Sequence, residues 1–175
     1  LVFSTGMAAV HAASCALLEK GSEIISHGTI YGCTFSMFTR WLSRHGVPVH
    51  FADLQKSDAF LPLVTPNTRI LYLESPVNPN LQLLDLQEIS SLVAELNKKR
   101  PEKEKILVVV DNTFATPYCQ RPIELGADVV VHSMTKGISG FGVDMGGAVI
   151  TRKEFYEPLA IFRKDFGSFL APYAA

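Results

Sequence analysis

Two titratable side chains follow apolar, strand-like runs in the second half of the chain. Asp111 closes an Ile-Leu-Val-Val-Val run, and Lys136 comes shortly after a second valine run, preceded by Ser133 and Thr135. A carboxylate close to a core needs a cationic partner, because an isolated buried charge is costly. Pyridoxal 5'-phosphate would use all four side chains: an amine for its aldehyde, a carboxylate for its ring nitrogen and hydroxyl donors for its phosphate. Turn capping by Asp111 and an ordinary solvated Lys136 are the alternatives.

A glycine-rich segment follows Lys136 and extends to Gly147. Most lysines are solvated, but a lysine between a buried strand and such a segment is expected to lose part of its hydration. Desolvation would make its amine a better nucleophile and base.

The segment Ser4–Ala8 passes from a strand-like start through small and hydroxyl residues into a helix. Free backbone N–H groups and the helix dipole at such a start favour an anion, for example a phosphate. A plain strand–helix turn with a capping hydroxyl is the alternative, because the segment matches neither the P-loop nor the GxGxxG pattern.

Two further side chains could contact a planar ligand. Tyr31, ahead of a helix, could stack on a ring and exchange a proton, or it could be a half-buried core tyrosine. Asn78 lies in a turn with a proline on either side, and it could either bind a ligand or serve the turn itself. Cys33 could be a reactive thiol at a helix start, whereas Cys15 and Cys119 are predicted to be buried filling residues.

Helical and extended segments alternate along the chain. Strands are expected over 1–3, 23–26, 47–51, 69–74, 106–110, 128–132 and 146–150, and helices over 7–19, 35–45, 59–65, 85–99, 123–126 and from 152 onward. Near-continuous Val/Ile/Leu strands between helices predict a three-layer α/β/α fold with a mostly parallel sheet. Ligands gather beyond the carboxyl ends of such strands, so one sheet edge would bring Asn78, Asp111 and Lys136 together.

The composition is that of an ordinary globular domain. The 175 residues are 47% hydrophobic and 19% charged, with a formal net charge of −1, which argues against disorder and against nucleic-acid or polybasic membrane binding. The histidines and cysteines show no metal-ligand spacing, so no metal site is expected. Few, scattered cysteines and the lack of an apolar stretch of membrane-spanning length predict a cytoplasmic protein.

Four segments together resemble the pyridoxal-phosphate enzymes of cysteine and methionine metabolism. That family includes methionine gamma-lyase, cystathionine gamma-synthase, the cystathionine lyases and O-acetylhomoserine sulfhydrylase. The segments are STGMAAV from Ser4, YGCTF from Tyr31, ESPVNP from Glu74, and VVDNTFATPYCQRPIELGADVVVHSMTK, which ends at Lys136. They cover most of the chain in the family's order, and the last segment is highly specific.

The resemblance implies a role for each candidate residue. Lys136 would form the internal aldimine with pyridoxal phosphate and shuttle protons, while Tyr31 would stack on the ring and act as an acid–base group at the leaving group. Asp111 would pair with the pyridine nitrogen, and Asn78 would lie near the ring hydroxyl. The catalytic residues would thus be Lys136 and Tyr31. The cofactor would be bound by Gly6, Met7, Tyr31, Asn78, Asp111, Ser133, Thr135 and Lys136. Its phosphate would be held by the backbone N–H groups of Gly6 and Met7 and by the hydroxyl groups of Ser133 and Thr135.

The resemblance also implies the fold and the assembly. Residues 1–175 would be part of the large, pyridoxal-phosphate-binding domain of the aspartate-aminotransferase-like enzymes of fold type I. Both ends of the chain look cut, so an N-terminal segment and a C-terminal small domain would lie outside it. The family forms homodimers or homotetramers with shared active sites, and its substrates are small amino acids, so neither nucleic acid nor membrane is expected as a partner.

The implied activity is that of a methionine gamma-lyase-like carbon–sulfur lyase, which catalyses α,γ-elimination. γ-Replacement on O-acetyl- or O-succinylhomoserine is the first alternative, and a non-catalytic homologue is the second. The joint presence of Lys136, Asp111 and Tyr31 argues against the second, because a structural role does not need all three. Gly137 and Phe141 depart from the family's usual Tyr after the lysine and its later Gly-His-Gly-Asp stretch, and we expect them to reshape the substrate pocket.

Overall fold

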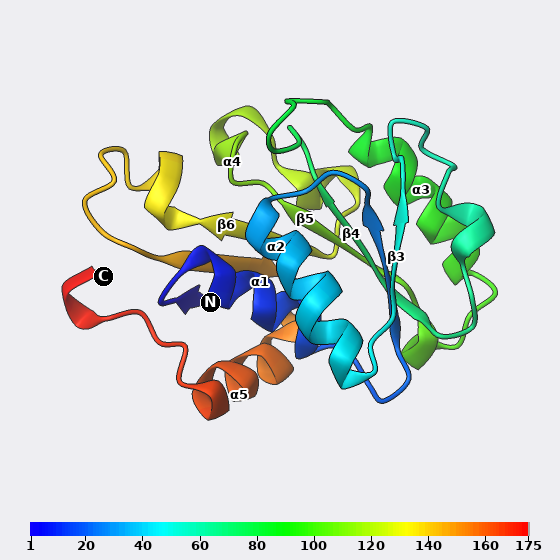
Figure 1. Cartoon of the computed structure of the whole chain (residues 1–175), viewed down its shortest axis with the longest axis horizontal. Helices are drawn as coiled ribbons and strands as arrows, with labels where there is room; N and C mark the ends of the chain where they lie inside the picture. Colours follow the sequence, from blue (N-terminus) through cyan, green and yellow to red (C-terminus); the bar gives the residue numbers. More distant parts are fainter. Residues whose placement is uncertain (175) are drawn as a thin grey trace.

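Seven strands form one sheet in the computed structural model, which describes residues 1–174 (Figure 1). The strands are β1 (Val2–Phe3), β2 (Glu23–His27), β3 (Val49–Ala52), β4 (Thr68–Glu74), β5 (Leu107–Asp111), β6 (Val129–Ser133) and β7 (Gly147–Thr151). Their order across the sheet is β1-β7-β6-β5-β4-β2-β3. The pairs among β2 to β6 are parallel, whereas β7 pairs antiparallel with both β6 and β1. The predicted mostly parallel sheet is therefore confirmed.

Five α-helices connect or follow the strands: α1 (Gly6–Cys15), α2 (Gly32–Ser36), α3 (Leu86–Asn97), α4 (Thr116–Cys119) and α5 (Tyr156–Phe166). α2 continues through a π-helical turn and a 3-10 turn to residue 45, where Gly46 ends it in the left-handed conformation (φ 77°). Further 3-10 or π turns are Leu61–Leu63, Glu102–Glu104, Pro122–Leu125, Met134–Ile138, Lys153–Phe155 and Pro172–Ala174. Side-chain caps begin the two most buried helices. Thr5 Oγ1 accepts the Ala8 N–H at 3.0 Å for α1, and Asp85 Oδ1 accepts the Glu88 N–H at 2.9 Å for α3.

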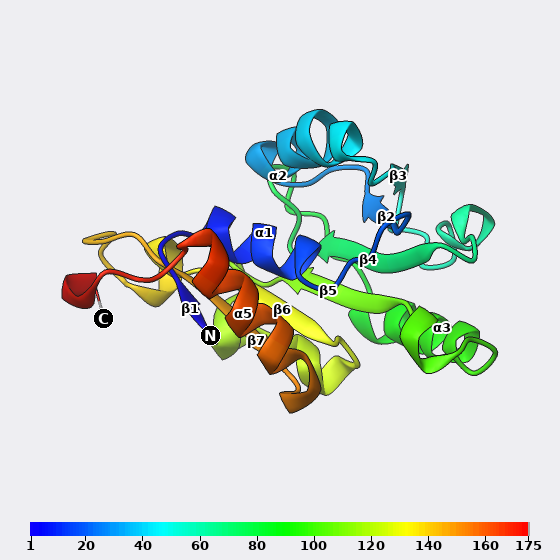
Figure 2. The same cartoon turned by 90° about the horizontal axis from the view of Figure 1, so that it is seen from below.

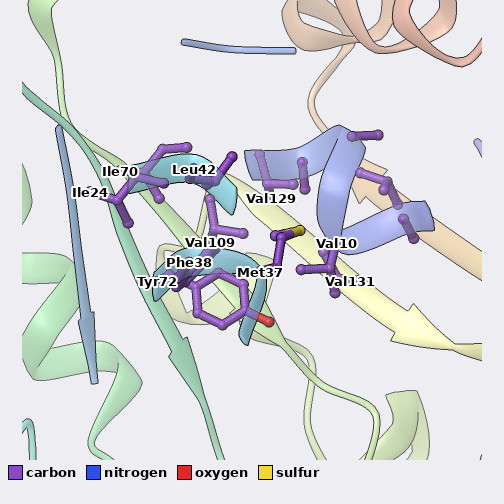
Figure 3. Close-up of a cluster of buried hydrophobic side chains, with 14 of the residues drawn as sticks. Val10, Ile24, Met37, Phe38, Leu42, Ile70, Tyr72, Val109, Val129 and Val131 are labelled. Atoms are coloured by element: carbon purple, nitrogen blue, oxygen red, sulfur yellow. The ribbon is translucent and has the colours of Figure 1, made fainter. Parts of the chain in front are cut away.

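Alternate residues of the strands face two separate apolar clusters. In β4, Ile70 and Tyr72 point into a cluster with α1, the α2 segment and α5, while Leu71 and Leu73 point into a cluster with α3. Figure 3 shows the first cluster, with Val10 of α1 and Phe38 of the α2 segment packed on the valines of β5 and β6. Figure 2 shows α1, α2 and α5 on one side of the sheet and α3 on the other. These two covered faces confirm the predicted three-layer α/β/α fold.

Several local predictions were wrong. α1 ends at Cys15 rather than near residue 19, because the chain turns there and places Leu17 and Leu18 against the first apolar cluster. The helix predicted over 59–65 is only one 3-10 turn, with Pro62 inside it. Cys119 is exposed rather than a buried filling residue, because α4 lies at the surface. Within residues 1–174, no helix has the length and apolar character that crossing a bilayer requires.

Candidate active site at the carboxyl ends of the strands

The strand register brings the sequence-predicted residues to one edge of the sheet. Glu74 at the end of β4 lies opposite Asp111 at the end of β5, and Asp111 lies opposite Val131 of β6. A cavity of about 230 Å³ opens beyond these strand ends. All eight predicted site residues line it: Gly6, Met7, Tyr31, Asn78, Asp111, Ser133, Thr135 and Lys136. The further lining residues are Thr5, Val10, Glu74, Pro76, Thr113 and Phe114.

One end of the cavity is built to hold an anion. The Thr5 side chain and carbonyl accept the N–H groups of Ala8 and Ala9, so within residues 1–174 the N–H groups of Gly6 and Met7 have no acceptor. A Cβ on Gly6 would lie 2.7 Å from Ser133 Cβ, so only glycine permits this close approach of α1 to the end of β6. Two free N–H groups at a helix start, beside a hydroxyl, form a phosphate cradle.

Two threonines fix the geometry of this end. Thr113 Oγ1 accepts the Ser133 N–H at 2.8 Å, and Thr135 Oγ1 accepts the Gly146 N–H at 3.1 Å. The Thr135 hydroxyl also lies 3.4 Å from the Gly146 carbonyl oxygen, a long hydrogen bond that an anion can replace. Thr113 was missed in the sequence, because a threonine two residues after a strand carries no distinctive signal.

The cavity wall also carries a carboxylate without a cation. Asp111 Oδ1 accepts the Thr113 N–H at 2.9 Å, and Asp111 takes part in none of the ion pairs within residues 1–174. Burial raises the pKa of Asp111, although the hydrogen bonds from Thr113 oppose this shift. A protonated ring nitrogen would supply the missing positive charge, as the sequence predicted.

Lys136 lies in the π turn that follows β6 and lines the cavity, but its residue is exposed. The expected loss of hydration at Lys136 is therefore not seen in the described part of the chain, where most residues of the glycine-rich segment after it are themselves exposed. Tyr31 is also 40% exposed, with its hydroxyl accepting a hydrogen bond from Cys33 Sγ at 3.4 Å. This contact raises the pKa of Tyr31. The placement leaves both side chains accessible from the open side of the cavity.

Glu74 is a cavity residue to which the sequence analysis gave no role. Its side chain is buried, its Oε1 accepts the Tyr31 N–H at 2.9 Å, and its Oε2 accepts the Asn78 N–H at 3.4 Å. Burial and the nearby charge of Asp111 raise the pKa of Glu74 to about 8. The signal was present, because Glu74 ends an apolar strand in the same way as Asp111.

Tyr72 lies beneath the two carboxylates on the same face of the sheet. It is fully buried against Phe38, with ring centroids 5.1 Å apart, and its hydroxyl has no hydrogen-bond partner within residues 1–174 (Figure 3). Burial, followed by the charges of Asp111 and Glu74, raises the pKa of Tyr72. Its hydroxyl therefore stays protonated and can donate toward Asp111, where it opposes the rise that burial causes in the pKa of that carboxyl group.

The residues present fit pyridoxal 5'-phosphate. The cavity combines an anion cradle that a Cβ on Gly6 would fill, a carboxylate without a cation, an amine and an accessible aromatic ring. A nucleotide phosphate would also fit the cradle, but it would not use the amine of Lys136 and the carboxylate of Asp111 that line the same cavity.

The chain matches the family described as Cys/Met metabolism PLP-dependent enzyme over residues 1–175. It is 43% identical over 174 residues to the L-methionine gamma-lyase of Fusobacterium nucleatum subsp. polymorphum, covering 98% of this chain and 42% of that protein. It is 40% identical over 177 residues to the L-methionine gamma-lyase of Pseudomonas deceptionensis, covering 100% of this chain and 43% of that protein.

A third relative has a different name. The chain is 35% identical over 174 residues to the cystathionine gamma-synthase/O-acetylhomoserine (thiol)-lyase of Bacillus subtilis, covering 99% of this chain and 44% of that protein. The chain thus spans less than half the length of each of these relatives. The family match extends over the whole sequence and includes every residue that lines the cavity, and the chain belongs to the Cys/Met metabolism PLP-dependent enzyme family.

Proposed function

We propose that the protein containing this chain is a methionine gamma-lyase-like carbon–sulfur lyase, which catalyses α,γ-elimination from a sulfur amino acid. The observation that carries the proposal is the convergence of all eight predicted residues on one cavity at the carboxyl ends of the strands. The relatives named L-methionine gamma-lyase support the choice of reaction.

The proposed roles follow from the chemistry of each group. When bound, pyridoxal phosphate supplies an electron sink for the charge that develops at the α-carbon of an amino acid. The N–H groups of Gly6 and Met7 hold the phosphate, together with Ser133 and Thr135. The Asp111 carboxylate pairs with the ring nitrogen and keeps it protonated, while Asn78 hydrogen-bonds the ring hydroxyl.

Two accessible groups move protons. When pyridoxal phosphate is bound, the Lys136 amine would hold its aldehyde. Once freed by substrate, the amine would take a proton from the substrate's α-carbon, release it to the cofactor, and then take a proton from the β-carbon. The Tyr31 hydroxyl exchanges a proton with the sulfur that leaves from the γ-carbon. The exposure of both side chains allows a substrate to reach them from the open side of the cavity.

We further propose that residues 1–175 are part of the large, cofactor-binding domain of a fold type I enzyme, and that homodimers or homotetramers complete their active sites with residues of a neighbouring subunit. The free cysteines agree with a cytoplasmic location, because all three are without a disulfide partner. The high exposure of Phe141, at 93%, agrees with cover by a neighbouring chain.

The test uses the whole protein with pyridoxal phosphate and L-methionine. We expect 2-oxobutanoate and methanethiol to form, and the Lys136→Ala variant to lose this activity by several orders of magnitude. Formation of neither product would contradict the lyase proposal.

γ-Replacement is the second candidate, favoured by the Bacillus subtilis relative. It would be recognised by a new thioether formed from O-acetyl- or O-succinylhomoserine and a thiol.

A further inference from the structure

The Glu74 side chain joins two segments of the cavity wall that are otherwise separate. One segment leads from β2 into α2 and carries Tyr31, and the other is the turn after β4 that carries Asn78. Glu74 Oε1 accepts the Tyr31 N–H at 2.9 Å, and Glu74 Oε2 accepts the Asn78 N–H at 3.4 Å. One carboxylate thus accepts a hydrogen bond from the backbone of both residues.

Neither N–H group has another acceptor within residues 1–174. The other hydrogen bonds of Tyr31 connect it only to Cys33 and Phe35, its neighbours along the chain. The Asn78 N–H contact is its sole hydrogen bond in the described part of the chain. Removal of the Glu74 carboxyl group would therefore leave both backbone N–H groups without a protein acceptor, and a buried donor left unpaired is costly.

The surroundings of Glu74 are unusual for a purely structural acid. Its side chain is 4% exposed, it lies opposite Asp111 in the strand register, and it forms no ion pair among the described residues. Two carboxylates on one face, without a cation, destabilise the fold. An amide at this position would keep an acceptor oxygen without placing a second acid beside Asp111.

We propose that Glu74 is a positioning residue of the cofactor pocket, whose two oxygens set the positions of Tyr31 and Asn78 relative to each other. The inference rests on the proposed function, because the two positioned residues flank the cofactor only if pyridoxal phosphate occupies the cavity. Glu74 acts through their backbones: its two oxygens are already used by the N–H groups. The expected consequence is a cofactor held in one orientation.

Two substitutions distinguish the positioning of the two segments by Glu74 from an effect of its negative charge. Glu74→Gln keeps one carbonyl oxygen as an acceptor and turns the other position into a donor, so one of the two N–H contacts is lost. Glu74→Ala removes both. We expect the dissociation constant for pyridoxal phosphate, measured with the whole protein, to increase roughly tenfold for Gln and roughly a hundredfold for Ala.

Asp128→Asn is the matched control. Asp128 is a half-buried acid that, like Glu74, accepts a backbone N–H, here from Val108 at 2.9 Å, but it lies at the opposite end of β6 and does not line the cavity. We expect this control to leave the cofactor's dissociation constant and its circular dichroism band unchanged. The two Glu74 variants should change that band, because it reports the orientation of the bound ring.

The outcomes are distinct. Graded weakening from Glu to Gln to Ala, with an altered circular dichroism band, supports the inference. Equal weakening in both variants would assign the effect to charge, and unchanged binding would assign Glu74 to the fold alone; either result overturns the inference while the proposed function stands. Failure of the wild-type protein to bind pyridoxal phosphate would overturn the proposed function and the inference with it.

Discussion

Asp111 and Glu74 end neighbouring strands on the same face, yet their surroundings assign them different tasks. Asp111 accepts one N–H from Thr113 and keeps part of its surface toward the cavity, so it can meet a cationic ligand. Glu74 is buried and uses both oxygens on backbone N–H groups. The sequence therefore predicts that each carboxylate lies at a strand end, whereas the residues around each carboxylate determine its role.

Gly6 offers a test of the phosphate cradle at the scale of one atom. Gly6→Ala places a Cβ 2.7 Å from Ser133 Cβ and 3.0 Å from Ser133 Cα, so α1 must move away from the end of β6. We expect the dissociation constant for pyridoxal phosphate to increase roughly fivefold to 150-fold, since overpacking of this kind costs ~1–3 kcal/mol. Binding of pyridoxal, which lacks the phosphate, should change less.

Gly28→Ala is the control for this substitution, because its Cβ would meet only the Ala52 carbonyl oxygen, at an ordinary 3.6 Å. Fluorescence titration of the apoprotein with both ligands provides the comparison. Equal loss of affinity for pyridoxal phosphate and pyridoxal would contradict the assignment of the cradle.

The elements follow the sequence most closely where they are buried. Apolar runs predicted all seven strands to within a few residues, and the Asp85 cap predicted the start of α3. The antiparallel direction of β7 and the contact between Glu74 and Asp111 depend on strand pairing over long sequence distances, which periodicity does not encode. The exposure of Lys136 was mispredicted for a similar reason, because it depends on the path of the segment after it.

The capping of α3 predicts a stability effect that leaves the site untouched. Asp85→Ala removes the acceptor for the Glu88 N–H, and we expect the free energy of unfolding to fall by ~1 kcal/mol. α3 contributes no residue to the cavity, so the affinity for pyridoxal phosphate should be unchanged. Urea unfolding should show a lower midpoint with the same slope. Asp85→Asn, which can still cap, is the control; a loss as large as that of alanine would argue against the cap.

The pair of unneutralised carboxylates makes the whole molecule sensitive to pH when no cofactor is bound. The pKa of Glu74 rises from 4.5 to about 8 on folding, so between these values the native state binds more protons than the unfolded state. The protonated Glu74 makes its full contribution to the free energy of unfolding below the pKa that Glu74 has in the unfolded chain. This contribution is lost as the pH rises through the pKa that Glu74 has in the folded protein. The raised pKa of Asp111 acts in the same direction.

We therefore expect the apoprotein to lose stability from pH about 5 to about 8, and Glu74→Gln to lose less over the same range. Urea unfolding of both proteins across this range measures the difference. Parallel curves for the wild type and the variant would show that Glu74 does not titrate in this window.

The edge strand β1 ties the beginning of the described chain to its end. Within residues 1–174, its only partner in the sheet is β7, with Val2 opposite Ala148, and a Cβ on Gly147 would collide with the Thr5 carbonyl oxygen. The Gly6–Met7 part of the phosphate cradle is synthesised first, and it is fixed in place only when β7, about 145 residues later in the chain, has formed. We therefore expect this part of the chain to leave the ribosome unable to hold its cofactor, and loading to begin only after β7 has emerged and docked.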